Sequence, residues 1–282
     1  MRLTRRTGLA GLAALAVSPW AQAGIHADTR SPVGQSLDEL RAGGRLRVGL
    51  YKDFAPFSTA SSEGPVGIDI DVARLIAARL GLELEPVLVA AGETVEDDLR
   101  NHVWRGTVVD HSTVNLLLHV PYARELQIRN ELAVLVRPYF TESLALARDP
   151  ERLPDGDALE GQPIGVELDS LASVRLGRLR ETLVHFRRPE EGLTALRTGV
   201  IAAFAGLSSQ IEAGLGPEQE RFAFGPLPGP GIASWPIGAA VRESARDLGS
   251  AVGDVLAEAA RDGAIAGIFA AHGAGFRPPP FA

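Results

Sequence analysis

The sequence predicts an α/β protein of two lobes, in which each lobe is a mainly parallel sheet flanked by helices. Short apolar runs typical of strands alternate with amphipathic helical stretches, and this alternation occurs in two blocks. A length of 282 residues is too great for one small core and fits two lobes of about 100 to 130 residues each. Extended segments near Tyr139 and Trp235 lie between the blocks and are predicted to cross from one lobe to the other.

The first block contains alternating strands and helices up to about residue 141. Residues 67–71 open a helix with apolar residues on one face, and we expect Asp69 to cap its start and Gly81 its end. Thr94 and the acids after it indicate the start of another helix, 94–105. The other predicted elements are a helical turn at 36–41, strands 45–51, 84–89, 116–118 and 132–136, and a short helix at 123–130.

The second block repeats the pattern after a hinge at 139–147. Its predicted strands are 163–167, 182–186 and 200–205, and its helices start at Ser170 and cover 189–197 and 208–213. A return hinge at 229–235 precedes strand 236–241 and one long helix, 244–271, expected to pack on the first lobe. The predicted domains are therefore 1–23 (a signal peptide), 24–141 (the first part of lobe 1), 142–233 (lobe 2) and 234–282 (the return to lobe 1).

Composition excludes several classes of function. The chain is 45% hydrophobic and 22% charged, as is ordinary for a folded soluble protein, and its net charge of −7 argues against binding to nucleic acid or to an anionic membrane. It has no cysteine, so it has no disulfide or thiol nucleophile. The acids at 93–98 are not expected to form a metal site, because consecutive carboxylates on a helix point in different directions.

The N-terminus predicts export. Three arginines precede an apolar stretch at 8–17, and small residues at 21–23 fit cleavage after Ala23, as in a secretory signal peptide. Residues 4–9 (TRRTGL) also fit a twin-arginine signal, and an ordinary charged n-region is the alternative. No later stretch approaches the ~20 apolar residues of a membrane span. We expect a periplasmic protein.

Four motifs in order carry a resemblance to a known family. They are residues 67–73 (GIDIDVA) after a loop ending in PF at 56–57, then 138–140 (PYF), 164–166 (IGV) and 262–265 (DGAI). Over about residues 44–274 the chain resembles the periplasmic solute-binding proteins of the kind that binds polar amino acids, extracellular solute-binding protein family 3. This resemblance implies the type II periplasmic-binding-protein fold, a ligand held between two closing lobes, and an ABC permease as partner.

A narrower likeness concerns residues 97–106 (DDLRNHVWRG) and 118–121 (LHVP). These stretches are similar to the branch whose genes accompany quinoprotein alcohol dehydrogenases in methylotrophs. That likeness implies an alternative role, in methanol metabolism, as an accessory protein for a periplasmic quinoprotein dehydrogenase.

Two departures from the family pattern bear on the ligand. Amino-acid binders of this family hold the ligand carboxylate with an arginine just after the third strand, whereas Arg124 stands one place late here. They hold the α-ammonium with an acid after a strand of the second lobe, where this chain has Leu207. An ammonium group buried without a counter-charge is unfavourable, so the ligand is expected to be a small polar or anionic solute other than a free α-amino acid.

Candidate ligand contacts lie where the predicted strands end, because ligands of open α/β sheets bind there. Each has a structural alternative: the aromatic rings could pack on their own lobe, His119 could be a hydrogen-bonded wall residue, and Arg124 could be a solvated helix residue. Trp104 is expected in the core. The candidates are Phe54, Phe57, His119, Tyr122, Arg124, Glu167, Ser170 and Leu207.

Three functions remain open at this point. We expect a monomeric binding protein without cofactor or metal that is not an enzyme. The accessory role is the second hypothesis. The third is a dehydratase acting on prephenate-like acids, as some proteins resembling this family are, with Glu167 or His119 as general acid.

Overall fold

The described strands of this chain form one mixed β-sheet. The structure is a computed structural model that describes residues 35–282 apart from 110, 155–158, 160, 180–181 and 281–282, so the predicted signal peptide lies outside the described residues. In the described part the strands are hydrogen-bonded in the order β2-β1-β3-β9-β4-β7-β5-β6, with β8 also paired to β4. The strands are β1 (Arg45–Tyr51), β2 (Glu83–Val89), β3 (Leu116–Pro121), β4 (Ala133–Arg148), β5 (Ile164–Glu167), β6 (Leu183–Phe186), β7 (Ala203–Leu207), β8 (Ala223–Pro226) and β9 (Ser234–Arg242).

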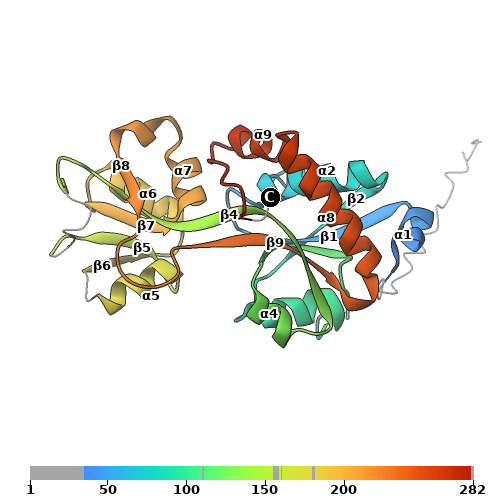
Figure 1. Ribbon diagram of the computed structural model, residues 1–282. Coiled ribbons are helices and arrows are strands. Elements are labelled where there is room, and N and C mark those ends of the chain that lie inside the picture. Colours follow the sequence, from blue (N-terminus) through green and yellow to red (C-terminus); the bar gives the residue numbers. More distant parts are fainter. Residues whose placement is uncertain (1–34, 110, 155–158, 160, 180–181, 281–282) are drawn as a thin grey trace, which may run out of the picture. The chain divides into compact units, whose positions relative to one another are not determined.

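The first α/β group is built on the parallel strands β2, β1 and β3. Helices α2, α8 and α9 contact one another and share a hydrophobic core with these strands (Figure 1). A second cluster on this group includes Leu99, Leu117 and Leu126 and contacts Trp104, which is partly buried as expected of a core residue. The helices are α1 (Leu37–Gly43), α2 (Ile68–Leu80), α3 (Val95–Asp98), a π-helical segment (Leu99–Trp104), α4 (Arg124–Arg129), α8 (Arg246–Arg261) and α9 (Ala264–Ala271).

The second α/β group is built on the parallel strands β6, β5 and β7. Two further hydrophobic clusters pack on it, one with Ala172 and Leu176 of α5 and the other with Leu193 of α6 and Ile211 of α7. Pro at the first position of α6 suits a helix start, because proline has no amide hydrogen to leave unpaired there. The helices are α5 (Leu171–Arg178), α6 (Pro189–Arg197) and α7 (Ser208–Leu215).

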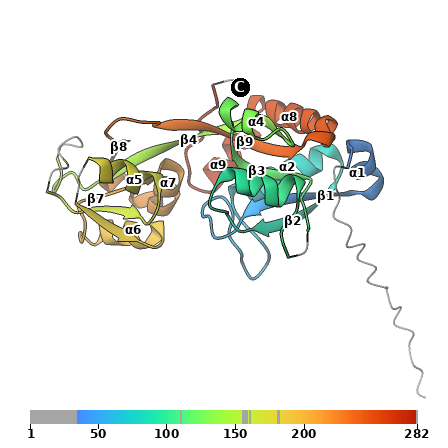
Figure 2. The same cartoon turned by 90° about the horizontal axis from the view of Figure 1, so that it is seen from below.

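Strands β4 and β9 run side by side between the two groups (Figures 1 and 2). β4 pairs with β9 from Ala133 to Ser143, and from Leu144 to Arg148 it pairs with β7 and β8 instead. The predicted hinge at 139–147 is part of β4, which crosses between the groups as an extended, hydrogen-bonded strand. Its change of partners joins the two parallel sets of strands into one connected sheet, where the sequence predicted two separate sheets.

Two further expectations need correction. Gly67, not Asp69, occupies the N-cap position of α2, and Asp69 lies inside the first turn with a fully buried side chain. The C-terminal helical stretch is two helices, because Gly263 takes a left-handed backbone between α8 and α9. Otherwise the predicted elements are present with end shifts of a few residues. Within the described residues, no helix is long and apolar enough to span a bilayer.

Candidate functional site

A cavity of about 500 Å³ opens where strands of both parallel sets end. Tyr51 ends β1, His119 lies near the end of β3, Glu167 ends β5 and Leu207 ends β7, and all four line the cavity. The carboxyl ends of strands in α/β sheets are the usual position of ligand sites, and this volume suits a small organic molecule. Residues of β4 and β9 complete the wall: Glu142, Leu144, Trp235 and Ile237.

His119 lies in a β-bulge of β3. The pairing of β3 with β9 shifts register between Leu118 and Val120, and His119 itself has a positive φ of 61°. A bulge re-aims a side chain out of the regular alternation, and here it places the imidazole at the cavity wall. The ring is packed against Phe54 and Phe57, with centroid separations of 4.7 and 4.3 Å.

A buried carboxylate fixes the orientation of this imidazole. Asp69 Oδ2 lies 2.9 Å from His119 Nδ1, and Asp69 Oδ1 accepts a hydrogen bond of 2.6 Å from the Tyr139 hydroxyl. A carboxylate on Nδ1 keeps the proton on that nitrogen and leaves Nε2 as the acceptor of the neutral ring. Nε2 has no hydrogen-bond partner among the described residues, so it is available to a ligand in the cavity.

Negative groups outnumber positive ones along the cavity wall. Among the described lining residues Asp53, Asp98, Glu142 and Glu167 carry carboxylates, whereas Lys52 is the one basic residue besides His119. Burial raises the pKa of Asp98, whose oxygens accept hydrogen bonds from Tyr51 and from the amide of Gly92. Burial and, secondly, the nearby Glu190 raise the pKa of Glu167. A site of this charge favours a neutral or positively charged ligand.

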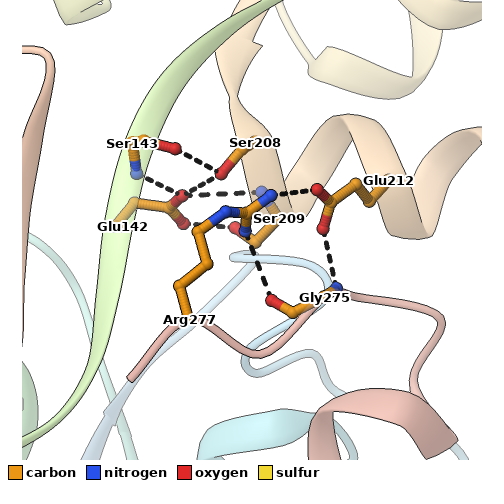
Figure 3. Close-up of polar contacts among 7 residues, drawn as sticks. All are labelled: Glu142, Ser143, Ser208, Ser209, Glu212, Gly275 and Arg277. Carbon is orange, nitrogen blue, oxygen red and sulfur yellow. Dashed lines mark hydrogen bonds and ion pairs between the residues drawn. The ribbon is translucent and has the colours of Figure 1, made fainter. Parts of the chain in front are cut away.

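Glu142 of β4 joins the cavity to the start of α7 (Figure 3). Its side chain is buried and accepts hydrogen bonds from the hydroxyls of Ser208 and Ser209 and from the amide of Ser143. The N-terminus of a helix carries a partial positive charge, which stabilises a carboxylate placed beside it. Glu142 thus holds the end of β7 and the start of α7 against the crossing strand.

The C-terminal segment forms a second connection to α7 (Figure 3). Glu212 of α7 accepts a hydrogen bond from the amide of Gly275 and makes an ion pair with Arg277. The backbone of Thr141 in β4 donates to the carbonyl of Arg277 at 2.8 Å. We call residues 273–279 the C-terminal strap, because they bind β4 and α7 together. A further contact joins the groups where the Gln210 amide donates to the carbonyl of Ala55.

Five of the eight predicted contact residues line this cavity, namely Phe54, His119, Glu167, Ser170 and Leu207. Phe57 lies behind them, fully buried and stacked on Phe54 at 5.0 Å. Tyr122 is half-buried and Arg124 is exposed, and neither lines the cavity, because β3 ends at Pro121 and Arg124 starts α4 on the surface. Ser170 is engaged as the cap of α5, accepting from the amide of Ser173 at 3.1 Å.

Several lining residues were not among the predicted contacts. Asp98 lies in an acid run that was attributed to the first turn of a helix, and Glu142 lies in the segment predicted as a hinge. Gln210 and Trp235 gave no signal besides their position after a strand and in a crossing segment. A charged residue between large apolar ones, as Glu142 is between Phe140 and Leu144, is the pattern that could have identified it.

The fold is that of the type II periplasmic binding proteins. A profile of the family described as "Bacterial extracellular solute-binding proteins, family 3" matches residues 46–103. The structure is similar to an ancestral cationic amino acid solute-binding protein, with a TM-score of 0.67, 18% identity and coverage of 84% of this chain and 99% of that one. No curated protein sequence shows significant similarity to the chain.

Two solved structures from bacteria are also similar. The solute receptor for L-cysteine of Neisseria gonorrhoeae has a TM-score of 0.57 and 21% identity over 84% of this chain and 93% of that one. Substrate-binding domain 2 of GlnP from Lactococcus lactis, in an open conformation, has a TM-score of 0.60 and 18% identity over 81% and 95%. At identities this low, the structural similarity shows that the fold is shared. The predicted fold class is therefore confirmed.

Proposed function

We propose that this chain is a periplasmic solute-binding protein that holds a small polar molecule in the cavity and delivers it to an ABC permease. The observation that carries the proposal is the cavity itself, formed where the strands of both α/β groups end and bordered by the strands that run between them. The family profile over residues 46–103 and the fold of the similar solute-binding proteins support it.

The charges of the cavity narrow the class of solute. Four carboxylates and one lysine line the described wall, so a neutral or cationic molecule is favoured over the anionic one that the sequence left open. Arg124 is exposed outside the cavity and Leu207 lines it. Neither charge that the family uses for an α-amino acid is supplied at those positions, which supports the expectation of another kind of ligand.

The same charges argue against the dehydratase alternative. A similar structure is described as that of an ancestral amino acid-binding protein, a precursor of cyclohexadienyl dehydratase. Prephenate-like substrates are carboxylates, and they would meet repulsion from Glu167, Asp98 and Glu142. The accessory role beside a quinoprotein dehydrogenase remains a prediction from the resemblance.

A screen of polar metabolites by thermal denaturation tests the proposal. A ligand that binds only the folded state stabilises it by RT ln(1 + [L]/Kd) and so raises the melting temperature as its concentration increases. Leu207→Trp should fill the cavity and abolish the shift, whereas Leu132→Trp, at a half-exposed position outside the cavity, should retain it. A broad screen without any shift, or a shift that Leu207→Trp leaves unchanged, would contradict the proposal.

A further inference from the structure

An apolar groove adjoins the ligand cavity. It has a volume of about 710 Å³ and shares four lining residues with the cavity, so the two spaces meet along one boundary. The shared residues are Pro121, Leu144, Leu171 and Trp235. A molecule larger than the cavity could therefore extend past Leu171 and Trp235 into the groove.

The groove leaves large apolar side chains in contact with water. Leu171 and Val174 on the outer face of α5 are 60% and 50% exposed, and Ile232 on the facing segment is 75% exposed. The buried face of α5 uses other residues, Ala172 and Leu176, so the outer ones are not needed for the core. Exposed apolar side chains gathered in a concave surface are typical of a binding site.

The facing wall of the groove is fixed in position by Arg175. Its guanidinium donates to the carbonyls of Leu227, Pro228, Gly229 and Ile232, which tie that segment to α5. Because these bonds occupy the guanidinium, Arg175 acts as a structural residue of the groove. Arg178, exposed at the groove, is the other basic residue of its wall. These hydrogen bonds of Arg175 fix the position of the segment that carries Ile232, and so keep the groove open.

The cavity offers the contrasting polar end. Glu167 is half-buried at the end of β5 and its carboxylate has no hydrogen-bond partner among the described residues. The rings of Phe54 and Trp235 also line the cavity, and aromatic faces attract organic cations. A cationic group on a ligand would gain a counter-charge there that the chain does not otherwise supply to Glu167.

We propose that the ligand is an amphiphilic amine whose ammonium group lies in the cavity near Glu167 and whose apolar chain lies in the groove against Leu171, Val174 and Ile232. This inference rests on the proposed function and gives the class of its solute. An apolar chain covers the exposed side chains of the groove, and each methylene removed from water strengthens binding.

Calorimetric titration with propyl-, pentyl-, heptyl- and nonylammonium chloride tests the inference on the full protein. Affinity should rise along the series by roughly fourfold per methylene once the chain reaches the groove. The double variant Val174→Ser/Ile232→Ser should lose most of the dependence of affinity on chain length. Val200→Ser removes a comparably exposed valine outside both spaces and should keep that dependence.

The head group is tested separately. Glu167→Gln should lower the affinity for all four amines by a similar factor. Heptyl sulfate, with the same chain and the opposite charge, should bind more weakly than heptylammonium. Absence of binding by the series, equal binding of heptyl sulfate, or a chain-length dependence unchanged in the double variant would overturn the inference. The proposed function fails separately, only if the metabolite screen also yields no ligand that Leu207→Trp excludes.

Discussion

Asp69 of α2 and Tyr139 of β4 are joined by a hydrogen bond of 2.6 Å between two fully buried side chains, 70 residues apart in sequence. The same carboxylate binds His119 through its other oxygen. The contact attaches the helix and the crossing strand to the residue that lines the cavity. Burial and the adjacent Asp69 raise the pKa of Tyr139 far above its ordinary value, so the phenol keeps its proton and acts as the donor.

Tyr139→Phe removes this donor while keeping the ring. The buried carboxylate of Asp69 then keeps His119 as its side-chain partner in the described part of the chain, and the free energy of unfolding should fall by about 1–3 kcal/mol. Urea denaturation followed by circular dichroism measures the change. Tyr122→Phe is the matched control at a half-buried site, where no hydrogen bond of the side chain is found in the described part, and a change within about 0.5 kcal/mol is expected. Equal stabilities of Tyr139→Phe and the wild type would contradict the assignment.

Local sequence pattern predicted most of this fold. Helix 189–197 has the predicted bounds, and α2 ends before Gly81 as predicted, because their apolar residues recur at helical spacing and a proline or glycine marks an end. The crossing strand was predicted less well. The sequence predicted a strand at 132–136 and a hinge at 139–147, whereas pairing with β9 and contact with the start of α7, both distant in sequence, continue β4 through this segment.

Candidate contacts were predicted where a strand end reveals the position, as for His119 and Glu167. Asp69 was misjudged because an acid in a first helical turn has an ordinary local explanation. Its partners, His119 and Tyr139, are 50 and 70 residues away and belong to other elements. The local sequence pattern predicts the start of the helix, but it does not predict the tertiary contacts that bury the Asp69 carboxylate.

His119 can be tested with two replacements that separate stability from binding. Asn tolerates the left-handed backbone of this position and can still donate to Asp69, so His119→Asn should fold with a small loss of stability. His119→Leu leaves Asp69 without this partner and strains the backbone, and should cost about 1–3 kcal/mol more. Both variants should bind a ligand found by the metabolite screen more weakly than the wild type does. Unchanged affinity in His119→Asn would exclude contact of the imidazole with the ligand.

The carboxyl of Glu167 gives a pH dependence with a defined sign. Its pKa is raised in the folded protein, by burial first and by Glu190 second. The proton is therefore bound more tightly in the folded state than in the unfolded one, and stability falls as pH rises from the unfolded pKa through the folded pKa. Above that window the loss is complete, and below the unfolded pKa it is absent.

Glu167→Gln removes this titration. Relative to the wild type, the variant should gain stability as pH rises through the window, measured by urea denaturation at intervals from pH 4 to pH 8. Glu190→Gln should shrink the same dependence without abolishing it, because it removes only the second cause. A stability difference between Glu167→Gln and the wild type that stays constant across this pH range would show that the pKa of Glu167 is not raised in the folded protein.

Gly67 is a position where a side chain cannot be accommodated. Its φ is 134°, and a Cβ there would lie 2.2 Å from the carbonyl oxygen of Phe57. Gly67→Ala should push the start of α2 away from the loop that carries Phe54 and Phe57. The free energy of unfolding should fall by at least roughly 1–3 kcal/mol, the cost typical of backbone strain. Gly267→Ala in α9 has open space around the new methyl group and should instead stabilise by about 0.5–1 kcal/mol. Denaturation of both variants checks the contrast, which would be lost if the loop could move freely.

Arg277 tests whether the C-terminal strap contributes to stability. The side chain of Glu212 is 8% exposed, and Arg277→Ala would leave that carboxylate with the amide of Gly275 as its remaining partner among the described residues. The free energy of unfolding should fall by about 1–3 kcal/mol, because a buried charge loses a partner. Hydrogen exchange should also quicken in α7, which the strap binds to β4.

Arg221→Ala is the control for this prediction. It breaks a solvent-exposed pair with Glu218 and should change stability by at most about 1 kcal/mol. If the two variants are equally stable, the ion pair between Arg277 and Glu212 contributes no more than an exposed one, and the strap does not hold α7 in place.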